Sequence, residues 1–158
     1  MPRFTFLLLL ILPNYSWACS CGRAGILKSR HHAAVIFTGT LIRSHTVIYT
    51  DTLSTSKAEV FTRSARLTRF TFRVDKLYKG QTRADTVSIL TSAGGADCGS
   101  NFSTNRSYLI YSWYTDRRPN DFRTEYTKVG KHLTTSVCSR TKANTFLTFY
   151  EKFWLAVL

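Results

Sequence analysis

Hydrophobic and polar residues alternate along much of this chain, which is the pattern of β-strands with one buried face. The clearest example is the stretch 68–78, where Phe70, Phe72 and Val74 alternate with threonine, arginine and aspartate. An earlier run rich in valine, isoleucine and phenylalanine contains Gly39, and a glycine there predicts a bend or bulge in the strand. We therefore expect a mainly β protein with five strands, over residues 33–42, 68–78, 86–91, 107–114 and 128–138.

The remaining segments predict one hairpin and two helices. Residues 46–64, rich in serine and threonine, are expected to form a long hairpin excursion between the first two strands. A short helix is predicted over residues 24–32, and a C-terminal helix over residues 142–158 with Asn144 as its N-cap. The second helix has apolar residues at spacings of three and four, and we expect this stripe to cover the strands and not to bind a membrane. The stripe comprises Phe146, Phe149, Tyr150, Phe153, Trp154 and Val157.

Residues 1–18 have the pattern of a secretory signal peptide. Arg3 supplies the positive charge, residues 4–12 form an apolar core, and small residues precede the expected cleavage site just before Cys19. The apolar run is shorter than the about 20 residues that a transmembrane helix needs, so we expect no membrane span. The sequence therefore predicts a secreted, extracellular protein whose mature part, residues 19–158, forms a single domain.

All of the cysteines lie in the predicted mature chain. An even number of cysteines in an oxidising compartment favours two disulfides, and four cysteines permit three pairings. A bond between the first two would strain a very short loop, so we expect both to be tied to the two later ones. Zinc ligation by cysteine with His31 and His32 is the alternative, but the spacing is not that of a structural zinc site, so we expect no metal of the protein's own. The cysteines are Cys19, Cys21, Cys98 and Cys138.

Lysine and arginine outnumber aspartate and glutamate, which gives a formal net charge of +13. Such a charge favours anionic partners, of which sulfated glycans suit a secreted protein and nucleic acid is the least favoured. The basic residues are scattered along the chain, as on a solvated basic face. Mutual repulsion of the charge favours a monomer. No nucleophile, base and orienting acid form a familiar arrangement, so we expect neither an enzyme nor a cofactor.

Five short antiparallel strands with flanking helices suit a Greek-key barrel of the OB type or a sandwich. A series of short motifs, in order along nearly the whole mature chain, resembles the inhibitory N-domain of the tissue inhibitors of metalloproteinases, within the netrin-like module family. The motifs are Cys19-Ser20-Cys21, Val-Ile-Phe-Thr-Gly at 35–39, Phe-Thr-Phe-Arg-Val-Asp-Lys-Leu-Tyr-Lys-Gly at 70–80, Asp97-Cys98-Gly99, Tyr108-Leu109-Ile110 and Cys138. The resemblance implies a disulfide-stapled, five-stranded OB-type barrel with bonds Cys19–Cys98 and Cys21–Cys138.

The resemblance also implies inhibition of zinc metalloendopeptidases. In such inhibitors the α-amino nitrogen and carbonyl oxygen of the first cysteine, here Cys19, displace the water on the protease zinc and chelate the metal. Ser20 then points into the specificity pocket beside the zinc. The rest of the contact ridge is formed by Cys21, Ala96, Asp97 and Cys98.

Three features depart from that family. The third disulfide of the family's N-domain has no cysteines here, Gly22-Arg23 replaces a proline-containing segment, and Asp97 stands where a small or apolar residue is usual. Some netrin-like modules do not inhibit proteases. The alternative hypothesis is therefore a non-inhibitory basic extracellular module that binds glycosaminoglycans or proteins.

Overall fold

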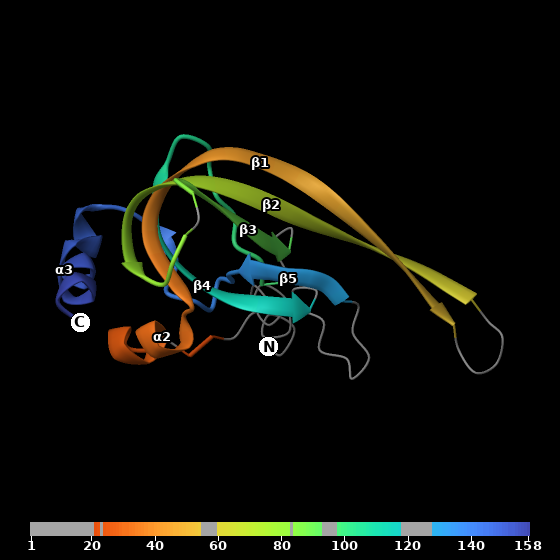
Figure 1. The fold of residues 1–158 in the computed structure, drawn as a ribbon, viewed down its shortest axis with the longest axis horizontal. Helices are drawn as coiled ribbons and strands as arrows, with labels where there is room; N and C mark the ends of the chain where they lie inside the picture. The colour runs from red at the N-terminus through yellow and green to blue at the C-terminus, as the bar shows by residue number, and fades with distance from the viewer. Residues whose placement is uncertain (1–20, 23, 55–59, 83, 93–97, 118–127) are drawn as a thin grey trace, which may run out of the picture.

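A computed structural model describes residues 21–22, 24–54, 60–82, 84–92, 98–117 and 128–158. Strands form most of this part of the chain, and a helix lies near each end of it (Figure 1). The elements are α2 (Ile26–His32), β1 (Val35–Ser54), β2 (Val60–Lys79), β3 (Thr86–Ser92), β4 (Ser107–Arg117), β5 (Lys128–Thr134), β6 (Lys142–Ala143), the 3₁₀ turn η2 (Phe146–Thr148) and α3 (Phe149–Val157).

Five strands close into a ring in the order β1-β2-β3-β5-β4, because β4 also pairs with β1. All neighbours in the ring are antiparallel except β3 and β5, which are parallel and pair only at Ile89 and Leu133. The ring is therefore nearly open between these two strands. This arrangement confirms the predicted five-stranded Greek-key barrel of the OB type.

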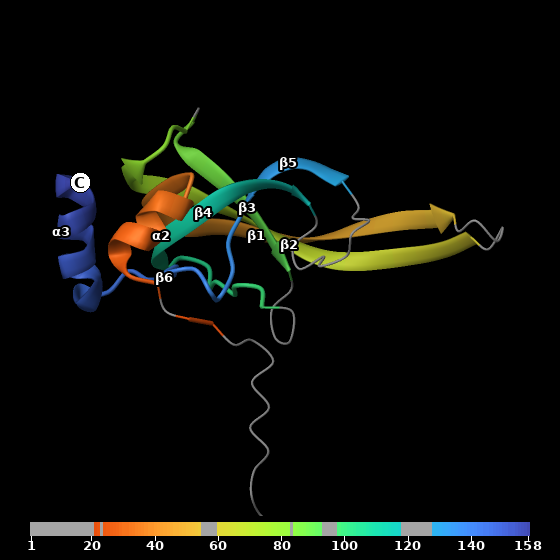
Figure 2. The same cartoon turned by 90° about the horizontal axis from the view of Figure 1, so that it is seen from below.

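β1 and β2 are the longest strands, and they pair from Ile36 and Lys79 out to Ser54 and Val60. Their far half extends away from the barrel as a two-stranded ribbon (Figure 2). The predicted hairpin excursion is thus confirmed, although much of it is regular strand. The bulge predicted at Gly39 is also found, because the register shifts between Thr38 and Gly39.

Other predicted limits were wrong. β5 ends at Thr134 and does not continue to residue 138, and the two-residue strand β6 was not predicted. The first helix begins at Ile26, two residues later than expected. The segment 142–158 is not one helix, since β6 pairs with β4 before the chain turns into η2 and α3.

The interior of the barrel is filled by the inward side chains of the ring strands, of which Phe37, Phe72, Ile89 and Ile110 are fully buried. Phe102, from the loop before β4, contacts three rings of the core, with centroid distances from 4.9 to 5.1 Å. Burial of each such side chain contributes about 2–3 kcal/mol to stability. Alternation in the sequence therefore predicted the inward residues of β2, where one face is buried, whereas consecutive residues of β1 and β4 are buried on both faces.

A second apolar cluster lies outside the barrel, where α2 and α3 pack side by side against β1 and β4 (Figures 1 and 2). Ile26 of α2 and Leu155 of α3 both contact this cluster. Its buried members on the barrel side are Ala33, Ile36, Leu109 and Tyr111. The two helices thus form one layer over one end of the barrel.

The orientation of α3 is the main correction to the sequence prediction. The predicted stripe does not cover the strands: Phe149, Tyr150 and Phe153 are 55–65% exposed, and the buried residues of α3 are Glu151 and Leu155. Asn144 is not the N-cap, because α3 begins at Phe149 after Thr148. Instead the Asn144 side-chain oxygen accepts hydrogen bonds from Thr148 and Lys152.

Candidate functional site

The three cysteines within the described residues come together at the start of the described chain. Cys21 is bonded to Cys138, 117 residues away, with a Cα–Cα distance of 5.1 Å. Next to this bond, the backbone N–H of Val137 donates to the carbonyl oxygen of Cys98 at 3.1 Å. Three segments that are far apart in sequence therefore meet at one place on the barrel.

The predicted bond Cys21–Cys138 is confirmed. Cys98 is also disulfide-bonded. Cys19 lies outside the described residues, so the bond Cys19–Cys98 stays a prediction. Of the three possible pairings of the four cysteines, only one contains Cys21–Cys138, and its second bond is Cys19–Cys98. Because Cys21, Cys98 and Cys138 are in disulfides, the alternative of a zinc site built from cysteine and histidine is wrong for these three residues.

The segment that follows Cys98 is held by a buried threonine. The hydroxyl of Thr91, at the end of β3, donates to the carbonyl oxygen of Thr135 and accepts from the backbone N–H of Ser100. All three residues are buried. This bridge joins the end of β3, the loop after Cys98 and the chain after β5, and it fixes the backbone on both sides of the disulfide cluster.

Cys98 itself has a backbone φ of +56°. Residues other than glycine seldom adopt this left-handed conformation, which costs of order 1 kcal/mol or more and persists where surrounding contacts enforce it. Here the bond of Cys98 and the neighbouring hydrogen bonds provide that enforcement. A strained residue therefore lies in the segment that the resemblance assigns to protease contact.

A second attachment holds the chain just after Cys21. Arg140 donates from Nη1 to the carbonyl oxygen of Ala24 at 2.9 Å, and from Nε and Nη2 to the two carboxylate oxygens of Glu151 at 2.7 and 2.8 Å. Lys142 also pairs with Glu151, and Tyr111 donates its hydroxyl to the same carboxylate at 2.6 Å. The start of the described chain, β4 and α3 are thus joined through one buried carboxylate.

The protonation of this cluster follows from its surroundings. Burial alone raises the pKa of Glu151, but the hydrogen bonds from Arg140, Lys142 and Tyr111 outweigh it and lower the pKa to about 2. Burial, followed by the hydrogen bond to the carboxylate, raises the pKa of Tyr111. Glu151 is therefore ionised and Tyr111 neutral at physiological pH.

Sequence reasoning missed this cluster. The sequence did contain an indication of it, because Glu151 is the only acid between residues 140 and 158 and lies within an aromatic segment. An isolated acid among apolar residues points to a buried, paired carboxylate.

Four of the residues predicted to contact or chelate a protease zinc, Cys19, Ser20, Ala96 and Asp97, lie outside the described residues. The structure brings together the other two, Cys21 and Cys98, with Cys138. His31 and His32 are exposed on α2, and no group of three or more metal-binding side chains occurs among the described residues.

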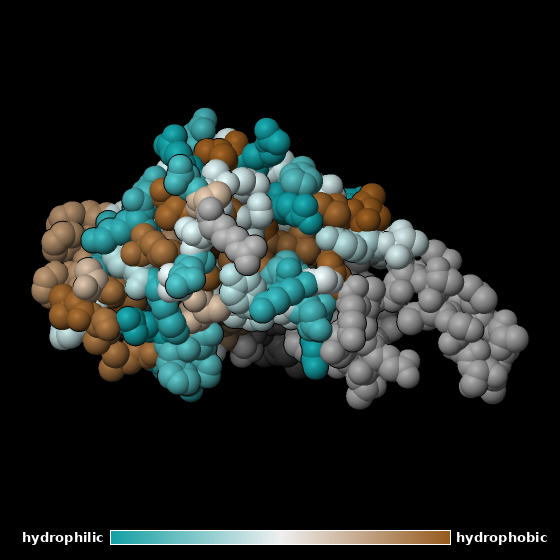
Figure 3. Space-filling view, viewed as in Figure 1, coloured by the Kyte–Doolittle hydropathy of each residue, from teal (hydrophilic) through white to brown (hydrophobic). Residues whose placement is uncertain are grey.

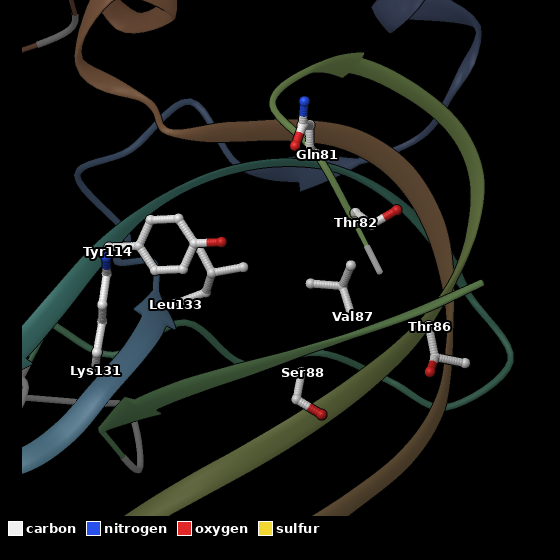
Figure 4. A pocket seen from close by; sticks show the side chains of 8 residues that line it. All are labelled: Gln81, Thr82, Thr86, Val87, Ser88, Tyr114, Lys131 and Leu133. Carbon is white, nitrogen blue, oxygen red and sulfur yellow. The ribbon is translucent and has the colours of Figure 1, made fainter. Parts of the chain in front are cut away.

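A cavity of about 610 Å³ lies at the nearly open seam between β3 and β5 (Figure 4). Val87 and Ser88 of β3 line it on one side, and Lys131 and Leu133 of β5 on the other. The ammonium group of Lys131 is 5.0 Å from the centroid of the Tyr114 ring, which also lines the cavity. The cavity therefore offers a bound group one cation, hydroxyl groups and apolar walls.

No protein-family model matches the chain, and no curated protein matches it significantly.

Proposed function

We propose that this protein, once its leader is removed, is a secreted inhibitor of zinc metalloendopeptidases similar to the N-domain of the tissue inhibitors of metalloproteinases. The α-amino nitrogen and the carbonyl oxygen of Cys19 bind the catalytic zinc of the protease. Ser20 enters the pocket beside the zinc, and the segments at Cys21 and at 96–98 form the contact ridge.

The observation that carries this proposal is the convergence of Cys21, Cys98 and Cys138 on an OB-type ring. Cys19 is two residues before Cys21, and two residues of extended chain span at most about 7 Å. The bond to Cys138 therefore limits how far an amine at Cys19 can move. An amine held in this way loses little conformational entropy on binding, which favours tight inhibition.

The chemistry of the amine supports the same role. The catalytic zinc of these proteases has three protein ligands and an open position that holds water. An α-amino group has an ordinary pKa of about 7.7–8.0, so its deprotonation at neutral pH costs only about 1 kcal/mol. The neutral amine and the adjacent carbonyl oxygen then replace the water as a chelating pair.

The test uses the mature protein, with its mass measured to confirm that it begins at an unmodified Cys19. One alanine added before Cys19 moves the amine away from the zinc and should weaken inhibition of a sensitive metalloendopeptidase by at least about a hundredfold. The control adds the same alanine after Leu158 and should inhibit like the unchanged protein. Equal inhibition by both extended proteins, or no inhibition of any enzyme in a broad panel by the unchanged protein, would refute the proposal.

A second candidate function is supported by a basic face on β1 and β2. Arg69 and Arg73 of β2 are four residues apart and therefore lie on the same face of the strand, which is the face opposite to the inward Phe70 and Phe72. Arg43 of β1 pairs with Thr71, which lies on that same outer face, so all three arginines point to the outer side of the ring. Sulfated glycans suit such a face. In this case replacing Arg43 and Arg73 by glutamine should lower the salt concentration that elutes the protein from heparin, whereas an alanine added before Cys19 should not.

A further inference from the structure

Eight of the fourteen large apolar side chains that are exposed in the described chain lie between residues 146 and 158, on α3, the turn before it and Leu158. The exposed fractions range from 40% for Trp154 to 88% for Phe146. The aromatic side chains contact one another, with Phe146 stacked on Phe149 and Trp154 against both Tyr150 and Phe153. Leu147, Val157 and Leu158 are exposed beside them. In Figure 3 the end of the molecule that carries α3 is correspondingly the most hydrophobic.

The helix cannot rotate to hide this surface. Its inner face is fixed by Leu155 in the apolar cluster and by Glu151, whose carboxylate binds Arg140, Lys142 and Tyr111. Rotation of α3 would break all three of these contacts and would bury aromatic rings against a charged cluster. The outward aromatic face is therefore a stable feature of the fold.

Positive charge accompanies the apolar face. The neighbouring helix α2 exposes Leu27 and Lys28, and its last turn carries Arg30. Both helices lie at the end of the molecule opposite the β1–β2 ribbon (Figure 2). The whole chain has a formal net charge of +13. This end can thus approach a flat anionic surface without obstruction by the ribbon.

We propose that α3 and α2 bind the surface of anionic phospholipid bilayers, with α3 lying in the interface and its aromatic face turned toward the acyl chains. Tryptophan and tyrosine favour the level of the lipid headgroups, and phenylalanine and leucine the apolar layer below. The charge complements an anionic surface and opposes docking of a second copy of this chain. No helix within the described ranges is long and apolar enough to cross a membrane.

The experiment measures sedimentation of the mature protein with vesicles of phosphatidylcholine and phosphatidylserine, and with vesicles of phosphatidylcholine alone. We expect binding to the anionic vesicles that weakens with added salt. Replacing Phe149 and Phe153 by glutamine should weaken this binding by at least about tenfold, because both rings leave the apolar layer. The matched control replaces the exposed Ile42 and Ile48 of β1 by glutamine and should bind like the unchanged protein.

Tryptophan fluorescence provides a second measurement. Emission should shift to shorter wavelength on addition of anionic vesicles, and replacement of Trp154 by phenylalanine should remove most of this shift while binding persists. The proposal is wrong if the unchanged protein does not bind anionic vesicles, or if the variant without Phe149 and Phe153 binds as well as the control. It is also wrong if sedimentation equilibrium shows that these two residues hold a stable dimer. None of these results depends on protease inhibition.

Discussion

The buried carboxylate of Glu151 should contribute a large part of the stability of this fold. Glu151 is 3% exposed and accepts hydrogen bonds from Arg140, Lys142 and Tyr111. The substitution Glu151→Gln keeps the size of the side chain and removes its charge. Two cations then lose their anionic partner at the point where α3 joins the barrel.

The magnitude follows from the pKa of the carboxyl group. Its decrease from the ordinary 4.5 to about 2 corresponds to about 3 kcal/mol of preference for the charged form in the folded protein. The side chains of Arg140 and Lys142 are 26% and 41% exposed, so water can partly solvate them after the substitution. We therefore expect Glu151→Gln to lower the free energy of unfolding by about 2–3 kcal/mol at pH 7.

The same contribution should depend on pH. Because the pKa of Glu151 is lower in the folded than in the unfolded chain, its contribution is complete above about pH 5 and is lost as the pH falls toward about 2. Urea denaturation with the disulfides intact, at several pH values, measures this. The difference between the unchanged protein and Glu151→Gln should be largest at pH 7 and nearly absent at the acid end.

The control is Asp116→Asn, which removes the same charge from an exposed position on β4 and should cost less than about 0.5 kcal/mol. A loss below about 1 kcal/mol for Glu151→Gln, or a loss that does not change with pH, would show that the carboxylate does not hold α3 in the way described here.

Three further variants test the barrel and its disulfide. Gly39→Ala would place a Cβ atom 2.7 Å from the carbonyl oxygen of Arg73, and we expect a loss of about 1–3 kcal/mol in urea denaturation; a neutral result would contradict the close approach of β1 and β2. Phe37→Ala would open a cavity at a fully buried position and should cost about 3–5 kcal/mol by the same assay, whereas an effect near zero would place Phe37 outside the core. Replacing both Cys21 and Cys138 by serine removes a bond that closes a loop of about 117 residues and should cost about 4–5 kcal/mol in the loop-entropy model; unchanged thermal unfolding would refute this contribution.

The barrel could be predicted from the sequence because apolar residues of the ring strands fill its interior. Phe70 and Phe72 are buried, and they alternate with Thr71 and Arg73, which are not, so alternation identified the part of β2 that lies in the barrel. The outer part of β1 was less visible, since residues 43–50 pair with β2 but have no buried face. β6 has only two residues and leaves no periodic signal.

The orientation of α3 could not be read from helical spacing. An aromatic stripe normally faces the core, but the ion pairs of Glu151 lie on the opposite side of the helix and fix that side inward. Hydrophobic periodicity predicts that a helix has two faces; which face is buried depends on residues outside the helix, here Arg140, Lys142 and Tyr111.

The candidate site was predicted in part. The resemblance implied the bond between Cys21 and Cys138, which is confirmed. The link from Arg140 to the carbonyl oxygen of Ala24 was not foreseen, because it joins positions 116 residues apart without a motif at either one. Such a contact becomes visible only when the barrel has brought both ends together.

The bond between Cys21 and Cys138 also sets an order of events during synthesis. The partner of Cys21 is translated only after β1 to β5 have been synthesised, so the beginning of the chain is cross-linked only after nearly everything that follows it has been made. The β1–β2 ribbon needs only neighbouring residues and can form early. A prematurely terminated chain that stops before residue 138 would thus lack the cross-link that fixes its first segment.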